Sequence, residues 1–131
     1  MNNIKHFFIS RYHSFGHAFR GWGYALKTQR NAWIHATATV LILILAFWLK
    51  LTLRDIAILL VTIALVWTAE FINTALEAVV DLASPQSHPL AKVGKDVGAA
   101  SVLIAAITSI LVGILILLNP LLEKVRPWFT K

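Results

Sequence analysis

The sequence predicts an all-α integral membrane protein, with an N-terminal amphipathic surface helix followed by three transmembrane helices. Of its 131 residues, 58% are hydrophobic and only 14% are charged, whereas a soluble domain carries about 25% charged residues. Residues Val97 to Leu118 include no Asp, Glu, Lys, Arg or His over 22 positions, and about 20 apolar residues are enough to cross the hydrocarbon. Since no repeat or long linker divides the chain, we expect residues 1–131 to form a single membrane domain.

Composition excludes several classes of function. The absence of cysteine rules out a disulfide framework and a thiolate metal site. Basic residues are spread through the first 30 positions, so this segment does not resemble a cleavable signal peptide. In so apolar a chain, the net charge of +6 favours anionic lipid headgroups and phosphorylated substrates as partners, and we expect no nucleic acid.

The N-terminal segment, about residues 4–30, is predicted to be an amphipathic helix lying on the membrane surface. Apolar residues recur there at alternating steps of four and three, which keeps them on one face of a helix: Phe8, Tyr12, Phe15, Phe19, Trp22 and Leu26. The opposite face carries bases: His13, His17, Arg20 and Lys27. This pattern is typical of interfacial helices; packing on a soluble partner is the alternative. Gly21 and Gly23 predict a close approach or a helix break.

Three hydrophobic segments follow, at about residues 32–49, 56–82 and 89–118. Trp33 and Trp48 bracket the first, as interfacial indoles often do. We interpret His35, one turn inside it, as an interfacial histidine bonded to backbone or headgroup. Small residues early in the third segment predict close helix packing in lipid.

The ends of the third segment carry their own signals. We expect it to begin at Pro89, capped by Ser87 or His88, and to stop at Asn119-Pro120. With three spans, seven Lys and Arg residues lie on the N-terminal side and five on the other. This excess places the N-terminus in the cytoplasm.

A stripe of polar residues runs along the second span. Glu70, Asn73, Glu77 and Asp81 follow one another at steps of three, four and four, which keeps them on one face of a helix. Only 14 residues, Ile56 to Ala69, precede Glu70, too few to cross a membrane. The stripe therefore straddles the cytoplasmic boundary of the bilayer, where carboxylates are expensive and usually functional.

The chemistry of this stripe favours phosphoryl transfer to a membrane alcohol. Two or three carboxylates with an amide form a hard-oxygen set suited to Mg²⁺. The start of the third span adds Lys92, Lys95 and Asp96 at the same boundary, and a lysine there can neutralise phosphate charge. No Walker A loop is present. The alternatives are an ion- or proton-conducting subunit that uses Glu70, and a catalytically inactive membrane scaffold.

Two sequence motifs resemble the bacterial diacylglycerol kinase/undecaprenol kinase family. They are E-F-I-N-T-A-L-E-A-V-V-D from Glu70 to Asp81 and H-P-L-A-K-V-G-K-D-V-G-A-A from His88 to Ala100. The resemblance implies a homotrimer in the bacterial cytoplasmic (inner) membrane, with its active site at the cytoplasmic face. It further implies ATP- and Mg²⁺-dependent phosphorylation of a lipid alcohol, diacylglycerol or undecaprenol. The H-P-L-A-K stretch is slightly more similar to the undecaprenol branch.

The resemblance also assigns roles to matching residues. Glu70 would be the catalytic base, and Asn73 and Asp81 would position the site. Glu77 and Gln29 would be the metal ligands. The family's usual residue at position 29 is Glu, so the neutral amide of Gln29 predicts weaker metal affinity or recruitment of another ligand.

The nucleotide site implied by the resemblance lies at the cytoplasmic ends of the second and third spans. Its members would be Lys95, Asp96 and His88, together with the metal ligands Glu77 and Gln29.

Overall fold

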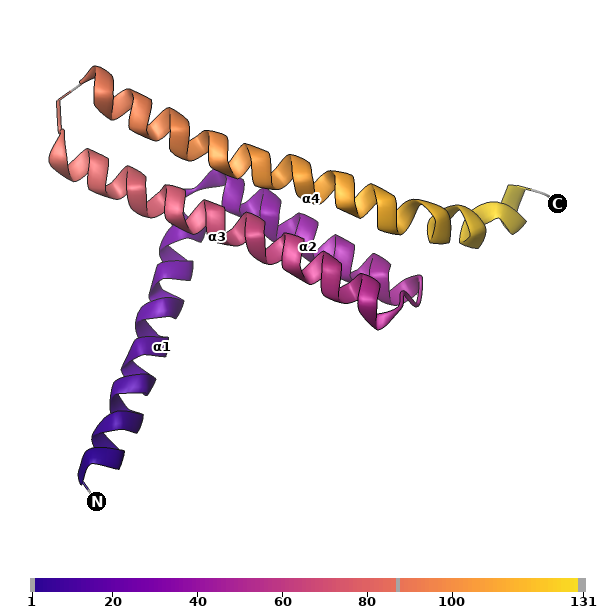
Figure 1. The fold of residues 1–131 in the computed structure, drawn as a ribbon, viewed down its shortest axis with the longest axis horizontal. Coiled ribbons are helices and arrows are strands. Elements are labelled where there is room, and N and C mark those ends of the chain that lie inside the picture. The colour runs from indigo at the N-terminus through magenta and orange to yellow at the C-terminus, as the bar shows by residue number, and fades with distance from the viewer. Residues whose placement is uncertain (1, 87, 130–131) are drawn as a thin grey trace.

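Four helices make up the fold in a computed structural model that describes residues 2–86 and 88–129. They are α1 (Asn2–Thr28), α2 (Arg30–Trp48), α3 (Leu53–Ala83) and α4 (Pro89–Phe129). Figure 1 shows α2, α3 and α4 running side by side, while α1 leaves this bundle crosswise and carries the N-terminus away from it. Each of α2, α3 and α4 is long and apolar enough to cross a membrane. The prediction of an all-α chain with three such helices is confirmed over the described residues.

The break between α1 and α2 falls at Gln29, whose backbone is extended (φ −106°, ψ 116°). Its N–H still donates to the carbonyl of Ala25 at 2.8 Å, so α1 ends on a complete turn. The expected break or close approach at Gly21 and Gly23 is wrong. Helix α1 continues through both glycines, and a Cβ at either would meet no atom within 4 Å. Glycine lowers helix propensity by only about 1 kcal/mol, which does not by itself end a helix.

A tight turn joins α2 to α3. Lys50, just after α2, adopts a positive φ of 56°, the backbone conformation that commonly ends helices. Thr52 then caps α3: its hydroxyl accepts from the N–H of Asp55 at 3.2 Å and donates to that residue's carboxylate at 2.7 Å. This reciprocal cap starts α3 about three residues earlier than the predicted start at residue 56.

Among the described residues, helices α3 and α4 form the most extensively packed pair, and they approach each other closely at Gly98. A Cβ at this position would overlap Asn73 Oδ1 and lie 3.1 Å from Leu76 Cδ2. The predicted close packing of the third span's small residues is confirmed here. At the opposite end of the bundle, Ala46, Leu59 and Leu117 form a buried apolar cluster contributed by α2, α3 and α4.

The predicted end of the last helix at Asn119-Pro120 is wrong, because α4 continues through Pro120 and Pro127 to Phe129. A proline removes one backbone hydrogen bond and bends a helix, and spanning helices tolerate that change. The extension has a contact of its own. The ammonium of Lys124 lies 5.6 Å from the ring centroid of Trp48 at the end of α2.

A loop joins α3 to α4 at one end of the bundle, which we call the hairpin end. This end extends past the point where α1 joins the bundle (Figure 1). Of the two residues predicted to cap α4, Ser87 lies outside the described residues. His88 does cap the helix, since its Nδ1 accepts from the N–H of Leu90 at 3.2 Å. The side chain of Phe8, predicted to belong to the apolar face of α1, also lies outside what the structure describes.

Candidate active site

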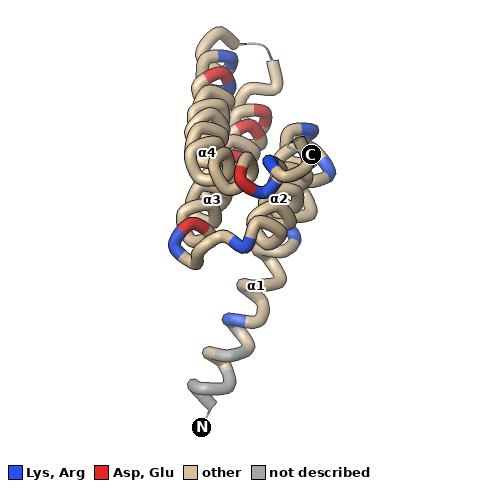
Figure 2. The backbone as a smooth tube through the Cα atoms, turned by 90° about the vertical axis from the view of Figure 1, so that its right-hand side faces the viewer, with Lys and Arg blue, Asp and Glu red and all other residues tan. Residues whose placement is uncertain are grey.

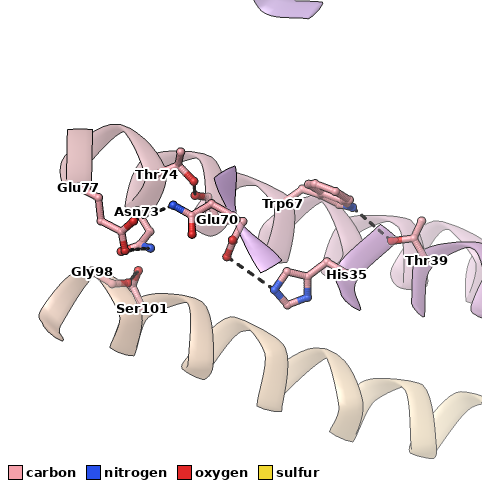
Figure 3. A network of polar contacts seen from close by, with 10 residues as sticks. His35, Thr39, Trp67, Glu70, Asn73, Thr74, Glu77, Gly98 and Ser101 are labelled. Carbon is pink, nitrogen blue, oxygen red and sulfur yellow. Dashed lines mark hydrogen bonds and ion pairs between the residues drawn. The ribbon is translucent and has the colours of Figure 1, made fainter. Parts of the chain in front are cut away.

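Along α3, the polar residues become more exposed toward the hairpin end. Glu70 is only 1% exposed and Asn73 only 6%, Glu77 is half-buried, and the side chain of Asp81 is 65% exposed. Figure 3 shows the first three of these following one another along α3. Burial of a carboxylate in a spanning helix is expensive. The gradient therefore separates one deep acid from two that lie nearer to water.

Glu77 is held by two side-chain amides. Gln29 Nε2 donates to Glu77 Oε2 at 2.7 Å, across 48 positions of sequence. Asn73 Nδ2, one turn earlier on α3, donates to Glu77 Oε1 at 3.1 Å. The break at Gln29 makes the first bond possible, because the extended backbone turns this side chain out of α1 and toward α3. The structure thus brings together the two residues expected to share a metal.

These residues fit Mg²⁺ as part of a shared site. Amide N–H groups cannot ligate a cation, but an amide rotated by 180° presents its oxygen in the same place. One carboxylate and one amide oxygen, completed by water and substrate phosphates, form a set that Mg²⁺ accepts. Among the described residues, no group of three or more His, Asp or Glu side chains could hold a metal by itself. The metal site suggested by Glu77 and Gln29 therefore depends on ligands from water and the nucleotide.

Asn73 also fixes the contact between α3 and α4. Its Oδ1 is buried without a hydrogen-bond partner and faces Gly98, where a larger residue would collide with it. On the far side of that contact, Ser101 Oγ donates to the Gly98 carbonyl at 2.6 Å (Figure 3). The amide that donates to Glu77 is therefore positioned by α4 as well as by α3.

At the hairpin end, Lys95 of α4 forms an ion pair with Asp81 of α3, with 2.5 Å between Nζ and Oδ1. Figure 2 shows acidic and basic positions gathered near this end of the two helices. The other two residues predicted to contact nucleotide, Asp96 and His88, are exposed. Within the described part of the chain, neither makes a hydrogen bond or ion pair with a carboxylate of α3. Four predicted site residues thus lie around the hairpin end. Asp81 and Lys95 are paired with each other, and among the described residues Asp96 and His88 are not paired with an α3 carboxylate.

The interpretation of His35 as an interfacial histidine bonded to backbone or headgroup is wrong. Its Nε2 faces Glu70 Oε2 across 3.7 Å, and the two side chains are only 15% and 2% exposed. The sequence contained a signal for this pairing. A deep carboxylate in a spanning helix needs a partner, and His35 is the basic residue that lies within the first span.

Aromatic rings connect α1 to this part of the bundle. Trp22 of α1 stacks on Trp67 of α3, with ring centroids 4.7 Å apart and an interplanar angle of 18°. Trp22 also packs against Phe71, with centroids 5.2 Å apart. Trp67 in turn donates from Nε1 to Thr39 Oγ1 at 3.2 Å (Figure 3). The end of α1 nearest Gln29 is therefore anchored one turn from Glu70.

A groove of about 490 Å³ lies between α2, α3 and α4. Its lining is aliphatic apart from four described side chains, which are His35, Thr39, Trp67 and Ser109. The groove runs from His35 along the spans to Leu117 and Leu121. It therefore joins the polar cluster to the hydrocarbon-facing part of the bundle.

Known proteins resemble this chain over most of its length. The family described as prokaryotic diacylglycerol kinase matches residues 16–117. A diacylglycerol kinase of Synechocystis sp. is 47% identical over 84% of this chain, which spans 63% of that relative's length. An undecaprenol kinase of Bacillus subtilis is 38% identical over 92% of this chain and 94% of its own length.

A third relative is more distant. A diacylglycerol kinase of Escherichia coli is 35% identical over 68% of this chain and 79% of its own length. The predicted resemblance is confirmed by the family match and by these relatives. The chain belongs to the prokaryotic diacylglycerol kinase family.

Proposed function

We propose that this protein is a lipid kinase that transfers the γ-phosphoryl group of ATP to the hydroxyl of diacylglycerol or undecaprenol. The observation that carries the proposal is the order of carboxylates along α3. Glu70 is 1% exposed within a spanning helix, and Glu77 lies two turns nearer the hairpin end, where it is half-buried. A lipid hydroxyl enters from the bilayer and a nucleotide from water, so the reaction requires this order.

Glu70 is the base that takes up the proton of the lipid hydroxyl. Glu77, with the amide oxygen of Gln29, would hold Mg²⁺, which when bound neutralises charge on the phosphates of ATP. Asn73 orients the Glu77 carboxylate through its hydrogen bond of 3.1 Å. Positioning and charge neutralisation supply most of the catalysis in phosphoryl transfer, and these residues provide both.

The nucleotide binds at the hairpin end. Lys95 supplies a positive charge there, and its ion pair with Asp81 keeps the ammonium beside the α3 carboxylates. Asp96 and His88 are exposed nearby on α4 and its cap, and they contact the nucleotide together with Lys95. Because the pair is solvent-accessible, it contributes little to stability, which leaves Lys95 free to exchange Asp81 for phosphate.

The protein acts as a homotrimer in the bacterial inner membrane, with the hairpin end and α1 on the cytoplasmic side. The crosswise direction of α1 in Figure 1 supports its role as a surface helix. Tyr12, Phe15 and Phe19 are 78%, 63% and 74% exposed on it, as expected of aromatic side chains that contact lipid. Chemical cross-linking in bilayers would test the trimer.

A single assay tests the proposed activity. Purified protein in bilayers, given labelled ATP, Mg²⁺ and either diacylglycerol or undecaprenol, should produce phosphorylated lipid. Glu70→Gln keeps the shape of the side chain but removes its basicity, so it should reduce the rate by about 10²–10⁴-fold. Absence of product with both alcohols would refute the kinase proposal, and the alcohol that yields product identifies the substrate.

A further inference from the structure

Two buried polar atoms face each other at the deep end of the site. His35 Nε2 and Glu70 Oε2 are 3.7 Å apart, and both are buried without a hydrogen-bond partner. Buried polar groups are rarely left unsatisfied, and each exception requires an explanation. Here the two exceptions are complementary, since a neutral imidazole with its proton on Nε2 is a donor and a carboxylate is an acceptor.

The distance between them is compatible with a working pair. A hydrogen bond of this type spans about 2.7–3.2 Å, so a shift of less than about 1 Å would form it. Catalytic hydrogen bonds are often long before substrate binds and shorten in the reacting complex. With Nε2 engaged by Glu70, the lone pair on Nδ1 is left for a ligand.

Access to the pair runs through the imidazole. Of these two described side chains, His35 lines the apolar groove between α2, α3 and α4, whereas Glu70 does not. Figure 3 shows the His35 ring reaching from α2 toward Glu70, with Trp67 and Thr39 next to it. A lipid that enters the site from the groove therefore meets His35 before it can meet Glu70.

We propose that His35 is a catalytic residue, through which the proton of the lipid hydroxyl reaches Glu70. This inference rests on the proposed lipid kinase function. The hydroxyl O–H bond breaks as its proton forms a bond to Nδ1, and the Nε2 proton moves to Glu70 Oε2. The lipid oxygen forms a bond to the γ-phosphorus, and the bond from that phosphorus to the β,γ-bridging oxygen breaks, with its electron pair leaving on ADP.

The surroundings favour this route. Before the transfer, the pair carries one negative charge, on the carboxylate of a buried Glu70 side chain; afterwards both members are neutral. Removing an isolated charge from an apolar site is favourable, because burial penalises the charged form. Direct abstraction of the hydroxyl proton by Glu70 is less favoured, because Glu70 does not line the groove.

His35→Gln tests the proposal, since a glutamine can still donate a hydrogen bond to Glu70 but cannot pass a proton. We expect kcat to fall by about 10²–10⁴-fold while the KM for ATP and the thermal unfolding midpoint stay close to wild type. His6→Gln, the same change at an exposed position of α1, should leave kcat unchanged. A purely structural role for His35 predicts that His35→Gln remains active, and that result would overturn the proposal.

A second measurement does not depend on activity or on a variant that folds. In wild-type protein with ¹⁵N-labelled histidine, in bilayers, the His35 resonances should show a neutral ring protonated at Nε2. A ring protonated at Nδ1 would overturn the proposal. If the wild-type protein phosphorylates neither alcohol, the kinase function fails. If it is active but His35→Gln matches it, the inference alone fails.

Discussion

Among the described residues, the two side chains that hydrogen-bond to the Glu77 carboxylate are neutral. Gln29 and Asn73 each donate one amide hydrogen to one of its oxygens, so the carboxylate is satisfied without a cation. Charge-assisted hydrogen bonds of this kind contribute roughly 1.5–3 kcal/mol each. Binding Mg²⁺ at Glu77 must replace at least one of them, which is the physical basis for expecting weak metal affinity in this chain.

Gln29→Glu should reverse that balance. A second carboxylate beside Glu77 has no hydrogen to donate and repels its neighbour, so the variant should be destabilised in EDTA and restabilised by Mg²⁺. We expect the Mg²⁺ concentration for half-maximal activity to fall by about tenfold, which corresponds to about 1.4 kcal/mol. Thermal unfolding with and without Mg²⁺, together with a Mg²⁺ titration of kinase activity, measures both effects.

Gln86→Glu provides the matched control. Gln86 is exposed in the loop between α3 and α4, so the same change in charge there should leave the Mg²⁺ dependence of stability close to that of wild type. Equal responses from the two variants would mean that Gln29 does not take part in metal binding.

Within the helices, one close approach constrains how α3 and α4 pack. Asn73 Oδ1 occupies the space where a side chain on Gly98 would begin. The contact therefore couples helix packing to the amide that holds Glu77. Because small residues let backbones come together in lipid, where no hydrophobic driving force acts between helices, the pair depends on this fit.

Gly98→Ala should separate the two helices locally. Overpacking of this kind destabilises a fold by about 1–3 kcal/mol, more than alanine's advantage in helix propensity of about 1 kcal/mol. Gly113→Ala is the control on the same helix, because a Cβ there would meet no atom within 4 Å, and its stability should stay equal or rise. Unfolding by denaturant in mixed micelles would compare them. If Gly98→Ala proved as stable as Gly113→Ala, the close approach would not limit packing.

The elements themselves were largely predictable from hydropathy, because a spanning helix needs a long uncharged segment and little else. The residues at which the helices begin and end were less predictable. The start of α3 depends on a side-chain cap at Thr52, and α4 passes Pro120 because a spanning helix tolerates the lost hydrogen bond. Within the site, the order of the α3 carboxylates follows from their spacing. Residue type alone makes His35 a candidate partner for Glu70, but their actual contact depends on how α2 is rotated against α3, which the sequence pattern of α2 does not specify.

At the scale of the whole molecule, helix lengths relate the site to the bilayer. The 31 residues of α3 span about 46 Å at 1.5 Å per residue, against about 30 Å of hydrocarbon. About ten residues of this helix therefore lie outside the hydrocarbon. If the apolar part begins near Ile56, it ends close to Leu76. Glu70 then lies within the hydrocarbon and Glu77 at its edge, in agreement with their exposure.

This placement predicts which residues water can reach from each side of the membrane. The chain has no cysteine, so each introduced one is its single thiol. With a membrane-impermeant maleimide, Gln86→Cys at the hairpin end should be labelled only from the cytoplasmic side, and Arg54→Cys at the start of α3 only from the other. Val61→Cys should not be labelled from either side. Val61 is 68% exposed in the isolated chain, but in a spanning helix that surface faces lipid or another subunit.

Labelling of Gln86→Cys and Arg54→Cys from the reverse sides would place the carboxylates of α3 away from cytoplasmic ATP and contradict the proposed orientation. Labelling of Val61→Cys would show that α3 does not cross the bilayer at this depth.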